Sequence, residues 1–330
     1  MKVVITDYEY DNVEKERKIV EEAGFSFCAY QCGSEDELIR ACREADAVIV
    51  QYSEMTERVI RAMEHCQMIV KYGIGVNNID TEAASEKGIY VCNVPDYGVD
   101  EVSNHAIAMI LALSKKLIRI DRSLKNGIWG YQPIEPLYRM AGKTLGLVGL
   151  GRIPSAVARK MSGFDLRILA YDPFVSRDEG RRRGAEMTDF ETLVRESDYI
   201  SIHCPLTEET KHLFREDVFK KIKNTAILVN TARGPIVDEK ALAEALRRGE
   251  IAGAGLDVFE QEPAEKGNPL LQMEQVICSP HCAWYSLEAV DAVQSKAALE
   301  AVNVLQGNSP WNAVNRKAAE DGRFKRAGLS

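Results

Sequence analysis

The chain has 330 residues, 45% of them hydrophobic and 28% charged, which is ordinary for a globular protein and long enough for about two domains of ~150 residues each. Its formal net charge of −8 argues against a nucleic-acid partner, because phosphate binding needs a basic face. Its eight cysteines form no C-x-x-C pair and have no histidine at zinc-ligand spacing, which favours reduced thiols in a cytoplasmic protein over a disulfide framework or a metal site.

The first hundred residues alternate short apolar strands with amphipathic helices. The chain opens directly on the strand-like run VVIT, so we expect no signal peptide. The next candidate strands are FSFCAY, AVIV, MIVKY and YVCNV, and helical patterns such as VEKERKIVEEAG and EDELIRACREA separate them. This alternation predicts a parallel sheet with helices on both faces.

The middle of the chain predicts a long helix and then a domain boundary. Apolar residues recur at helical spacing from about Glu101 to Lys125. The longest apolar run, Ala106–Leu113, is too short to cross a bilayer, so we expect no membrane segment. The stretch NGIWGYQPIEPLYRMAGK that follows is rich in aromatic residues, proline and glycine. This composition is typical of a loop, and we place the boundary in this region.

A second β–α series begins at TLGLVGLG and continues through RILAYD, YISIHC, AILVN, AGAGLDV and QVICS. A final amphipathic helix, about Leu287–Leu305, ends at Gly307, and a polar tail follows it. Because this helix comes after the second series is complete, we expect it to pack back on the first series. The sequence therefore predicts two α/β units, and a cleft between two such units is a usual place for a ligand.

The stretch GLVGLGRIPSAVA is similar to the G-x-G-x-x-G turn that binds dinucleotides, with Gly149 and Gly151 in place but Pro154 at the third glycine. A strand precedes it, a helix follows it, and Asp172 ends the next strand 21 residues after Gly151, as the motif requires. An acid there bonds the adenosine ribose and repels a 2′-phosphate, which favours NAD over NADP. The alternative is a relic turn. We favour binding, because the phosphate-facing N–H groups near Arg152 precede the proline, which fits a helix's first turn.

Polar side chains follow several of the predicted strands. Arg233 comes after AILVN, Asp257 and Glu262 lie in LDVFEQEP, and His281 comes after QVICS. A glycine turn, GIG, follows the first-unit strand MIVKY. Ligands of open α/β sheets bind at the carboxyl ends of the strands. Arginine binds a carboxylate through two hydrogen bonds, histidine exchanges a proton, and a carboxylate orients the histidine. With NAD, this set predicts hydride transfer at a 2-hydroxy or 2-keto acid.

Other polar residues have structural interpretations. We expect His203 to support the cofactor loop from within a strand, and His105 to be a packed, hydrogen-bonded residue of an apolar helix. The run RRRG, Arg181–Gly184, is the nearest approach to a basic patch, and a solvated helix end is its favoured interpretation.

The motifs TARG, LDVFEQEP and SPH, in this order after the glycine turn, carry a family resemblance. The chain resembles the NAD-dependent D-isomer-specific 2-hydroxyacid dehydrogenases over nearly its whole length. It is most similar to the C-terminal-binding-protein-like branch, on the stretches GVNNID, VCNVPDYGVDE and HCAWYS. That branch includes transcriptional corepressors that retain the dehydrogenase fold.

The resemblance implies two doubly wound α/β domains with a cleft between them. Residues 1–100 and 287–330 would form a flavodoxin-like substrate-binding domain, and residues 101–286 a Rossmann NAD-binding domain. The implied enzyme interconverts a 2-keto acid and a D-2-hydroxy acid. Arg233 would bind the substrate carboxylate, and His281, paired with Glu262, would act as general acid and base. A homodimer through the cofactor domain and its long helix is also implied. The alternative is an NAD(H)-sensing interaction protein of the corepressor type.

The resemblance also implies which residues contact each ligand. Those expected at the cofactor are Val148, Gly149, Leu150, Gly151, Arg152, Ile153, Asp172, Cys204, Pro205, Leu206, Thr210, Thr231, Ala232, Arg233, Asp257, His281 and Trp284. Those expected at the substrate are Lys71, Ile74, Gly75, Arg233 and Trp284. Tyr52, Tyr72, Ile74 and Trp284 predict a partly apolar substrate pocket. The identity of the acid stays open among pyruvate, glyoxylate, hydroxypyruvate, 3-phosphoglycerate and larger branched acids.

Overall fold

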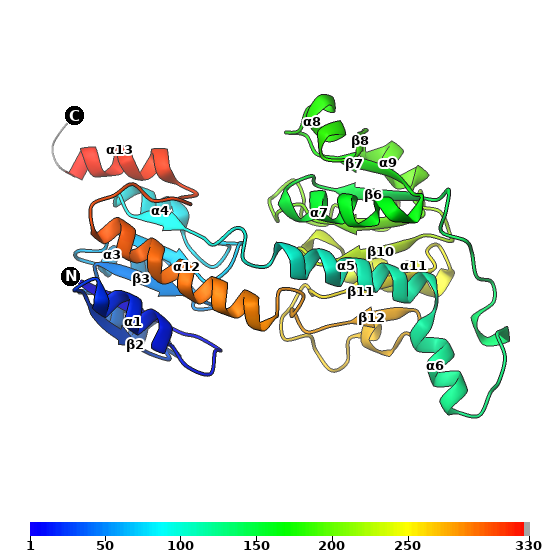
Figure 1. The fold of residues 1–330 in the computed structure, drawn as a ribbon, viewed down its shortest axis with the longest axis horizontal. Helices are drawn as coiled ribbons and strands as arrows, with labels where there is room; N and C mark the ends of the chain where they lie inside the picture. Colours follow the sequence, from blue (N-terminus) through cyan, green and yellow to red (C-terminus); the bar gives the residue numbers. More distant parts are fainter. Residues whose placement is uncertain (327–330) are drawn as a thin grey trace. The chain divides into compact units, whose positions relative to one another are not determined.

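The structure, a computed structural model, describes residues 1–326 and divides them into two compact α/β units (Figure 1). Unit 1 contains Met1–Tyr97 and the chain from Ser286 onward, and unit 2 contains Gly98–Tyr285. The boundary predicted in the loop of residues 126–143 is wrong, because that loop lies within unit 2. Each unit is built on one parallel sheet with helices on both faces. The predicted fold class is therefore confirmed.

In the described residues of unit 1, five parallel strands lie in the order β2-β1-β3-β4-β5. The strands are β1 (Lys2–Ile5), β2 (Ser26–Ala29), β3 (Ala47–Val50), β4 (Met68–Lys71) and β5 (Tyr90–Cys92). Successive side chains of a strand point to opposite faces, so Val3 packs with α1 (Glu14–Glu22) and α12 (Leu287–Leu305) on one face. Val4 packs on the other face, with α2 (Glu35–Cys42), α3 (Glu57–Ala62) and α4 (Thr81–Glu86). The final helix thus packs back on the first sheet, as the sequence predicts.

The predicted tail is polar, but its described part forms a helix that the sequence did not predict, α13 (Arg316–Arg326). Asn315 anchors its start: the Asn315 side chain accepts from the Val91 N–H at 2.8 Å and donates to the Ile89 carbonyl at 3.0 Å. Ala319 is fully buried, and a Cβ at Gly322 would lie 2.0 Å from the Ser85 carbonyl oxygen of α4. Two small residues, Ala319 and Gly322, therefore make the contact between α13 and the rest of unit 1. Because most of the segment is polar, it has no periodic apolar pattern that would predict a helix.

In the described residues of unit 2, seven parallel strands lie in the order β12-β11-β10-β9-β6-β7-β8. They are β6 (Thr144–Val148), β7 (Arg167–Tyr171), β8 (Glu186–Met187), β9 (Tyr199–Ile202), β10 (Ile227–Asn230), β11 (Gly253–Leu256) and β12 (Val276–Cys278). The sequence prediction missed only the two-residue β8 among them. The strand order reverses direction between β6 and β9, which is where a doubly wound sheet binds its ligand.

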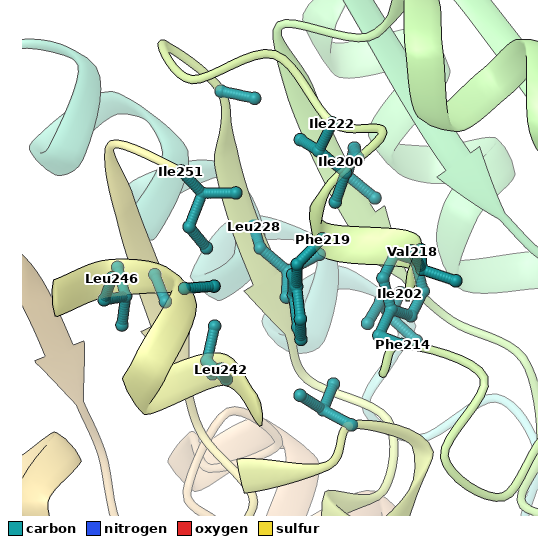
Figure 2. Close-up of a cluster of buried hydrophobic side chains, with 14 of the residues drawn as sticks. Ile200, Ile202, Phe214, Val218, Phe219, Ile222, Leu228, Leu242, Leu246 and Ile251 are labelled. Carbon is teal, nitrogen blue, oxygen red and sulfur yellow. The ribbon is translucent and has the colours of Figure 1, made fainter. Parts of the chain in front are cut away.

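Helices cover both faces of this sheet. On one face, α9 (Phe190–Glu196), α10 (Glu216–Phe219) and α11 (Glu239–Arg248) pack on the strands through a cluster that includes Phe214, Phe219, Leu242 and Leu246 (Figure 2). On the other face lie α5 (Val99–Ser114) and α7 (Arg152–Met161). The helix α8 (Arg177–Arg182) packs beside β8 at the edge of the sheet. This packing holds the carboxyl ends of the strands, and the loops that follow them, in fixed positions.

The single long helix that we predicted from Glu101 to Lys125 is wrong. It is two helices, α5 and α6 (Leu117–Lys125), separated by Lys116 in a left-handed conformation with φ +49°. The Lys116 ammonium donates to the Pro136 carbonyl at 2.9 Å, so the residue that breaks the helix also ties down the loop after α6. A periodic apolar pattern cannot reveal one left-handed residue. Among the residues that the structure describes, no helix is long and apolar enough to cross a membrane.

Candidate functional site

The glycine turn follows β6 at the point where the strand order reverses. Gly149 has φ +91°, and a Cβ there would lie 3.0 Å from the Cys204 backbone nitrogen, in the loop that follows β9. Only glycine suits both the dihedral angle and the close approach. The turn and the β9 loop are therefore pressed together, which brings Gly149 and Cys204, both predicted at the cofactor, to the same edge of the sheet.

Gly151 stands at the start of α7, as its N-cap residue, and is exposed. No described side chain caps this helix, and, apart from Gly151 and its two chain neighbours, no described atom lies within 4 Å of a Cβ built at Gly151. The first N–H groups of a helix have no partner inside the helix and attract anions. An open, uncapped helix start after a glycine turn fits the pyrophosphate of a dinucleotide.

Asp172 follows β7, beside the turn. One of its carboxylate oxygens accepts from the Leu150 N–H and the other from the Phe174 N–H, both at 2.9 Å. A carboxylate has about four lone-pair positions, so each oxygen can still accept a ribose hydroxyl. The geometry thus fits the predicted role of Asp172, and the same side chain also supports the turn.

Pro154 is buried and occupies the third position of α7. The first backbone bond inside the helix runs from the Ser155 N–H to the Gly151 carbonyl, at 3.1 Å. The nitrogen of residue 154 would have no partner inside the helix in any case, so the proline loses no hydrogen bond. Pro154 is therefore a buried packing residue, and it leaves intact the N–H groups that are predicted to bind phosphate.

We expect Pro154→Gly to change NADH affinity by less than tenfold, about 1.4 kcal/mol. The reason is that the substitution changes a buried packing contact and leaves the turn's N–H groups in place. Fluorescence titration of wild type and variant with NADH measures the change. A loss greater than tenfold would mean that the ring itself shapes the phosphate site.

The loop after β9 carries four more predicted residues, Cys204, Pro205, Leu206 and Thr210. The Thr210 hydroxyl donates to the Pro205 carbonyl at 2.7 Å and accepts from the Thr207 N–H at 2.7 Å. Burial raises the pKa of the Cys204 thiol to about 11. The Thr210 side chain therefore holds the shape of the loop, and Cys204 stays a neutral thiol.

His203 directly follows β9, and its Nε2 lies 2.8 Å from the Ser201 hydroxyl. Burial lowers the pKa of His203 to about 3, whereas the pKa of an unfolded histidine is about 6.5. The folded protein keeps this ring neutral where the unfolded chain takes up a proton. His203 therefore contributes stability above pH ~6.5 that is lost as the pH falls toward ~3.

Between pH 7 and pH 5, we expect the unfolding free energy of wild type to fall by about 2 kcal/mol more than that of His203→Asn. The variant removes the group that the unfolded chain protonates, and every other titrating group is shared. Urea unfolding at the two pH values gives the difference. If the unfolding free energy fell equally in the two proteins, the pKa of His203 would be the same in the folded and unfolded states, and the expectation would be wrong.

Arg233, Glu262 and His281 follow β10, β11 and β12, and the structure brings these three side chains together. His281 Nδ1 lies 2.6 Å from Glu262 Oε2, and the Phe259 N–H donates to Glu262 Oε1 at 3.0 Å. Partial burial acts to raise the pKa of Glu262, but the hydrogen bond and charge of His281, the Phe259 N–H and the charge of Arg233 together hold this pKa below its ordinary value. Glu262 is therefore a carboxylate aimed at the imidazole.

Gly234 explains how the Arg233 loop reaches the Glu262 loop. A Cβ at Gly234 would lie 1.8 Å from the Phe259 carbonyl oxygen, so no larger residue fits. The Asn230 side chain braces the same loop, because it accepts from the Ala232 N–H at 3.0 Å and donates to the Arg233 carbonyl at 2.9 Å. The Thr231 hydroxyl is buried without a hydrogen-bond partner among the described residues.

His281 has a left-handed backbone, with φ +52°, and Asp257 holds it there. The His281 N–H donates to the Asp257 carbonyl at 2.7 Å. The Asp257 carboxylate, which is 1% exposed, accepts from the N–H groups of Cys282 and Ala283 at 3.0 Å and from the Ser279 hydroxyl at 2.6 Å. Asp257 therefore shapes the loop that presents His281. Its predicted contact with nicotinamide stays a prediction.

Two further side chains complete this loop. His105, on α5, places Nε2 2.8 Å from the Ser279 hydroxyl, so the predicted hydrogen bond of this histidine joins the helix to the loop after β12. The Trp284 indole N–H donates to the His281 carbonyl at 3.1 Å, and its ring meets Tyr285 edge-on at 5.8 Å between centroids. Ser279 is a support that the sequence did not predict, although its place within the SPH motif was a signal.

In unit 1, the predicted residues lie at the carboxyl edge of the sheet: Lys71 is the last residue of β4, and Ile74 and Gly75 follow it. The Lys71 ammonium lies 5.4 Å from the centroid of the Tyr52 ring. The Ile74 carbonyl accepts from the Asn93 side chain at 2.7 Å. Tyr72 does not belong with them: it is buried, and its hydroxyl donates to Glu16 at 2.5 Å. The prediction of Tyr72 as a pocket residue is wrong, because its side chain packs in the core of unit 1 and bonds to Glu16 of α1.

The solvated-helix interpretation of the RRRG run is wrong for one of its arginines. Arg181 and Arg182 form exposed pairs with Asp178 and Glu179. Arg183 instead donates to the Leu150 carbonyl, in the middle of the glycine turn. Sequence offers no signal for this bond, since it joins residues that are far apart along the chain.

Comparison with known proteins identifies the family. The family model described as "D-isomer specific 2-hydroxyacid dehydrogenase, NAD binding domain" matches residues 107–283. The chain is 39% identical over 287 residues to a glyoxylate reductase of Korarchaeum cryptofilum, covering 86% of each chain. It is 40% identical over 293 residues to a D-3-phosphoglycerate dehydrogenase of Archaeoglobus fulgidus, covering 88% of this chain but 55% of that one. The chain thus spans about half the length of the second relative.

A solved structure shows the same fold. The crystal structure of a D-lactate dehydrogenase of Aquifex aeolicus, complexed with NAD and lactic acid, matches with a TM-score of 0.83 and 30% identity, covering 93% of this chain and 96% of that one. The family match is to an NAD-binding domain, which gives NAD as the cofactor, in agreement with the open helix start and with Asp172. The chain belongs to the family of D-isomer specific 2-hydroxyacid dehydrogenases.

Proposed function

We propose that this protein is an NAD-dependent oxidoreductase that interconverts a 2-keto acid and a D-2-hydroxy acid. The observation that carries the proposal is the 2.6 Å pair of His281 and Glu262, with Arg233 close enough to lower the pKa of Glu262. All three side chains belong to the unit that holds the glycine turn. Reduction of a 2-keto acid requires a proton donor, a group that binds the substrate carboxylate, and a hydride carrier close to both. This unit supplies the first two, and its glycine turn is predicted to hold the third.

Each residue has a separate task in this proposal. Arg233 binds the substrate carboxylate through its planar guanidinium. Because Nδ1 of His281 is occupied by Glu262, the proton passes to the keto oxygen from Nε2, or returns there in the oxidation. Glu262 fixes the orientation of the ring and balances the positive charge of the imidazolium. NADH, when bound, supplies the hydride. From unit 1, we propose that Lys71, Ile74 and Gly75 contact the substrate.

Among the acids left open, we propose a small unphosphorylated one such as glyoxylate. Supporting this choice, the glyoxylate reductase described above is matched over 86% of its length and the phosphoglycerate dehydrogenase over 55%. A phosphorylated substrate also needs a cluster of basic residues to bind its phosphate. The sequence offers no second arginine cluster with that role.

Turnover with a panel of keto acids tests the function. NADH oxidation is followed by absorbance with glyoxylate, pyruvate, hydroxypyruvate and 3-phosphohydroxypyruvate, and the configuration of the product is determined by chiral chromatography. We expect turnover, fastest with an unphosphorylated acid, and a D product wherever the product is chiral. Absence of turnover with every acid would overturn the proposal.

The alternative, an NAD(H)-sensing interaction protein of the corepressor type, gains no support from the relatives described above, which are named as reductases and dehydrogenases. The catalytic side chains do not distinguish the two functions. NADH-dependent capture of a partner protein by a chain that lacks keto-acid turnover would favour this alternative.

We also propose that the protein is a homodimer, joined through α6 and the loop that follows it. None of the nine described residues of α6 is buried. Large apolar side chains of this arm (residues 117–138) are exposed: Leu117, Ile118, Leu124, Ile128, Trp129, Tyr131, Leu137 and Tyr138. Exposed apolar patches of this kind mark interaction sites, and a second copy of the chain would bury the same patch on both sides.

We expect Trp129→Ser to weaken the dimer at least tenfold, since Trp129 is 90% exposed and large aromatic side chains dominate interface energies. Sedimentation velocity over a dilution series measures the dissociation constant. Phe174→Ser is the matched control, because Phe174 is 95% exposed in the same unit but outside the arm. A monomeric wild type, or equal weakening by both substitutions, would contradict this interface.

A further inference from the structure

Both peptide groups of Leu150 are held by charged side chains. Its N–H donates to Asp172 Oδ2 at 2.9 Å, and its carbonyl accepts from the Arg183 guanidinium. Its side chain is fully buried. Leu150 lies between Gly149 and Gly151, so the residue at the centre of the glycine turn is fixed from three directions.

Arg183 is itself held in place. It directly follows α8, and its Nε donates to Glu179 Oε1 at 2.7 Å. Its side chain is 34% exposed, whereas that of Arg182, which pairs with the same Glu179, is 73% exposed. One carboxylate therefore holds two neighbouring arginines, and the structure places the more buried one on the turn.

The hydrogen bond from Arg183 to the Leu150 carbonyl controls the direction of the Gly151 N–H. The Leu150 carbonyl and the Gly151 N–H belong to one planar peptide unit and point in opposite directions. When the guanidinium holds the carbonyl, the Gly151 N–H must point away from Arg183. Glycine permits many backbone conformations, so without this bond the peptide can rotate and turn the donor away from the ligand.

We propose that Arg183 is a positioning residue for the dinucleotide phosphates: it fixes the Leu150–Gly151 peptide so that the donors at the start of α7 face the pyrophosphate. The inference rests on the proposed cofactor site at the glycine turn. It differs from simple charge attraction, because Arg182 carries the same charge one residue away without a bond to the turn.

The test compares Arg183→Ala, Arg183→Lys and Arg182→Ala. NADH affinity is measured by fluorescence titration, and the affinity of adenosine, which lacks phosphates, by competition against NADH. For Arg183→Ala we expect the NADH dissociation constant to rise about tenfold, with adenosine affinity and kcat at saturating NADH unchanged. Arg183→Lys keeps a donor and restores most of the loss. Arg182→Ala stays near wild type.

Three results would overturn the inference. An equal loss in Arg182→Ala would show charge attraction alone, and an equal loss of adenosine affinity would show a collapsed turn. Unchanged NADH affinity in Arg183→Ala would show that the bond has no effect. Thermal unfolding of each variant confirms that the protein folds. A wild type that binds NADH but reduces no keto acid would overturn the proposed function and leave this inference standing.

Discussion

Replacing His281 by alanine is expected to lower kcat/KM for keto-acid reduction by about 10²–10⁴-fold, the usual contribution of a positioned general acid. The variant removes the proton donor and leaves Glu262 without its 2.6 Å partner. Steady-state assays of NADH oxidation measure the loss, with NADH titration as the check that cofactor binding persists.

Glu262→Gln is the companion variant. It keeps the size of the side chain and a hydrogen bond to the ring but removes the negative charge that balances the imidazolium. We expect its activity to fall between that of wild type and His281→Ala. Undiminished turnover in His281→Ala would remove His281 from the mechanism, whatever Glu262→Gln does.

Replacing Arg233 by alanine is expected to lower kcat/KM for the keto acid by about 100- to 1000-fold, since losing one partner of a desolvated charge pair costs about 2–5 kcal/mol. Arg233→Lys keeps the charge but loses the two-pronged geometry, so it recovers little of the substrate affinity. A KM that stays at the wild-type value in both variants would contradict a carboxylate-binding role.

The pH profile separates the two variants of Arg233. Its charge is one of the causes that hold the pKa of Glu262 low. Arg233→Ala removes that charge, the pKa of Glu262 rises, and Glu262 becomes protonated at a higher pH. The acid limb of the profile should therefore move to higher pH in Arg233→Ala. Arg233→Lys should leave that limb near its wild-type position.

Much of the fold can be read from the sequence because its signals are local. The strands of both units are short, continuous apolar runs, as buried parallel strands require. Arg233, Glu262 and His281 could be grouped because each follows a strand, and parallel strands bring their carboxyl ends to one edge. Asp172 could be placed by its distance from Gly151.

The rest depends on contacts that leave no periodic pattern. Lys116 breaks a helix through one backbone angle, and α13 packs through two small residues in a polar segment. Arg183 resembles its exposed neighbours in sequence, yet it alone of the three arginines reaches Leu150. Asp257 is an acidic residue at a predicted strand end, as a site residue would be, but its carboxylate accepts hydrogen bonds from the backbone of the loop that carries His281. Each case depends on a partner that is distant along the chain.

The path of the chain sets an order of folding during synthesis. Unit 2 is one continuous segment, Gly98–Tyr285, and a Cβ at Gly98 would lie 3.5 Å from the Trp284 Cβ, so its two ends meet. Unit 1 lacks α12, with the fully buried Ala297 and Ala301, until the ribosome has translated past Leu305. The N-terminal domain of a growing chain generally folds first. Here the inserted second unit can complete its core while the first still waits for its last helix.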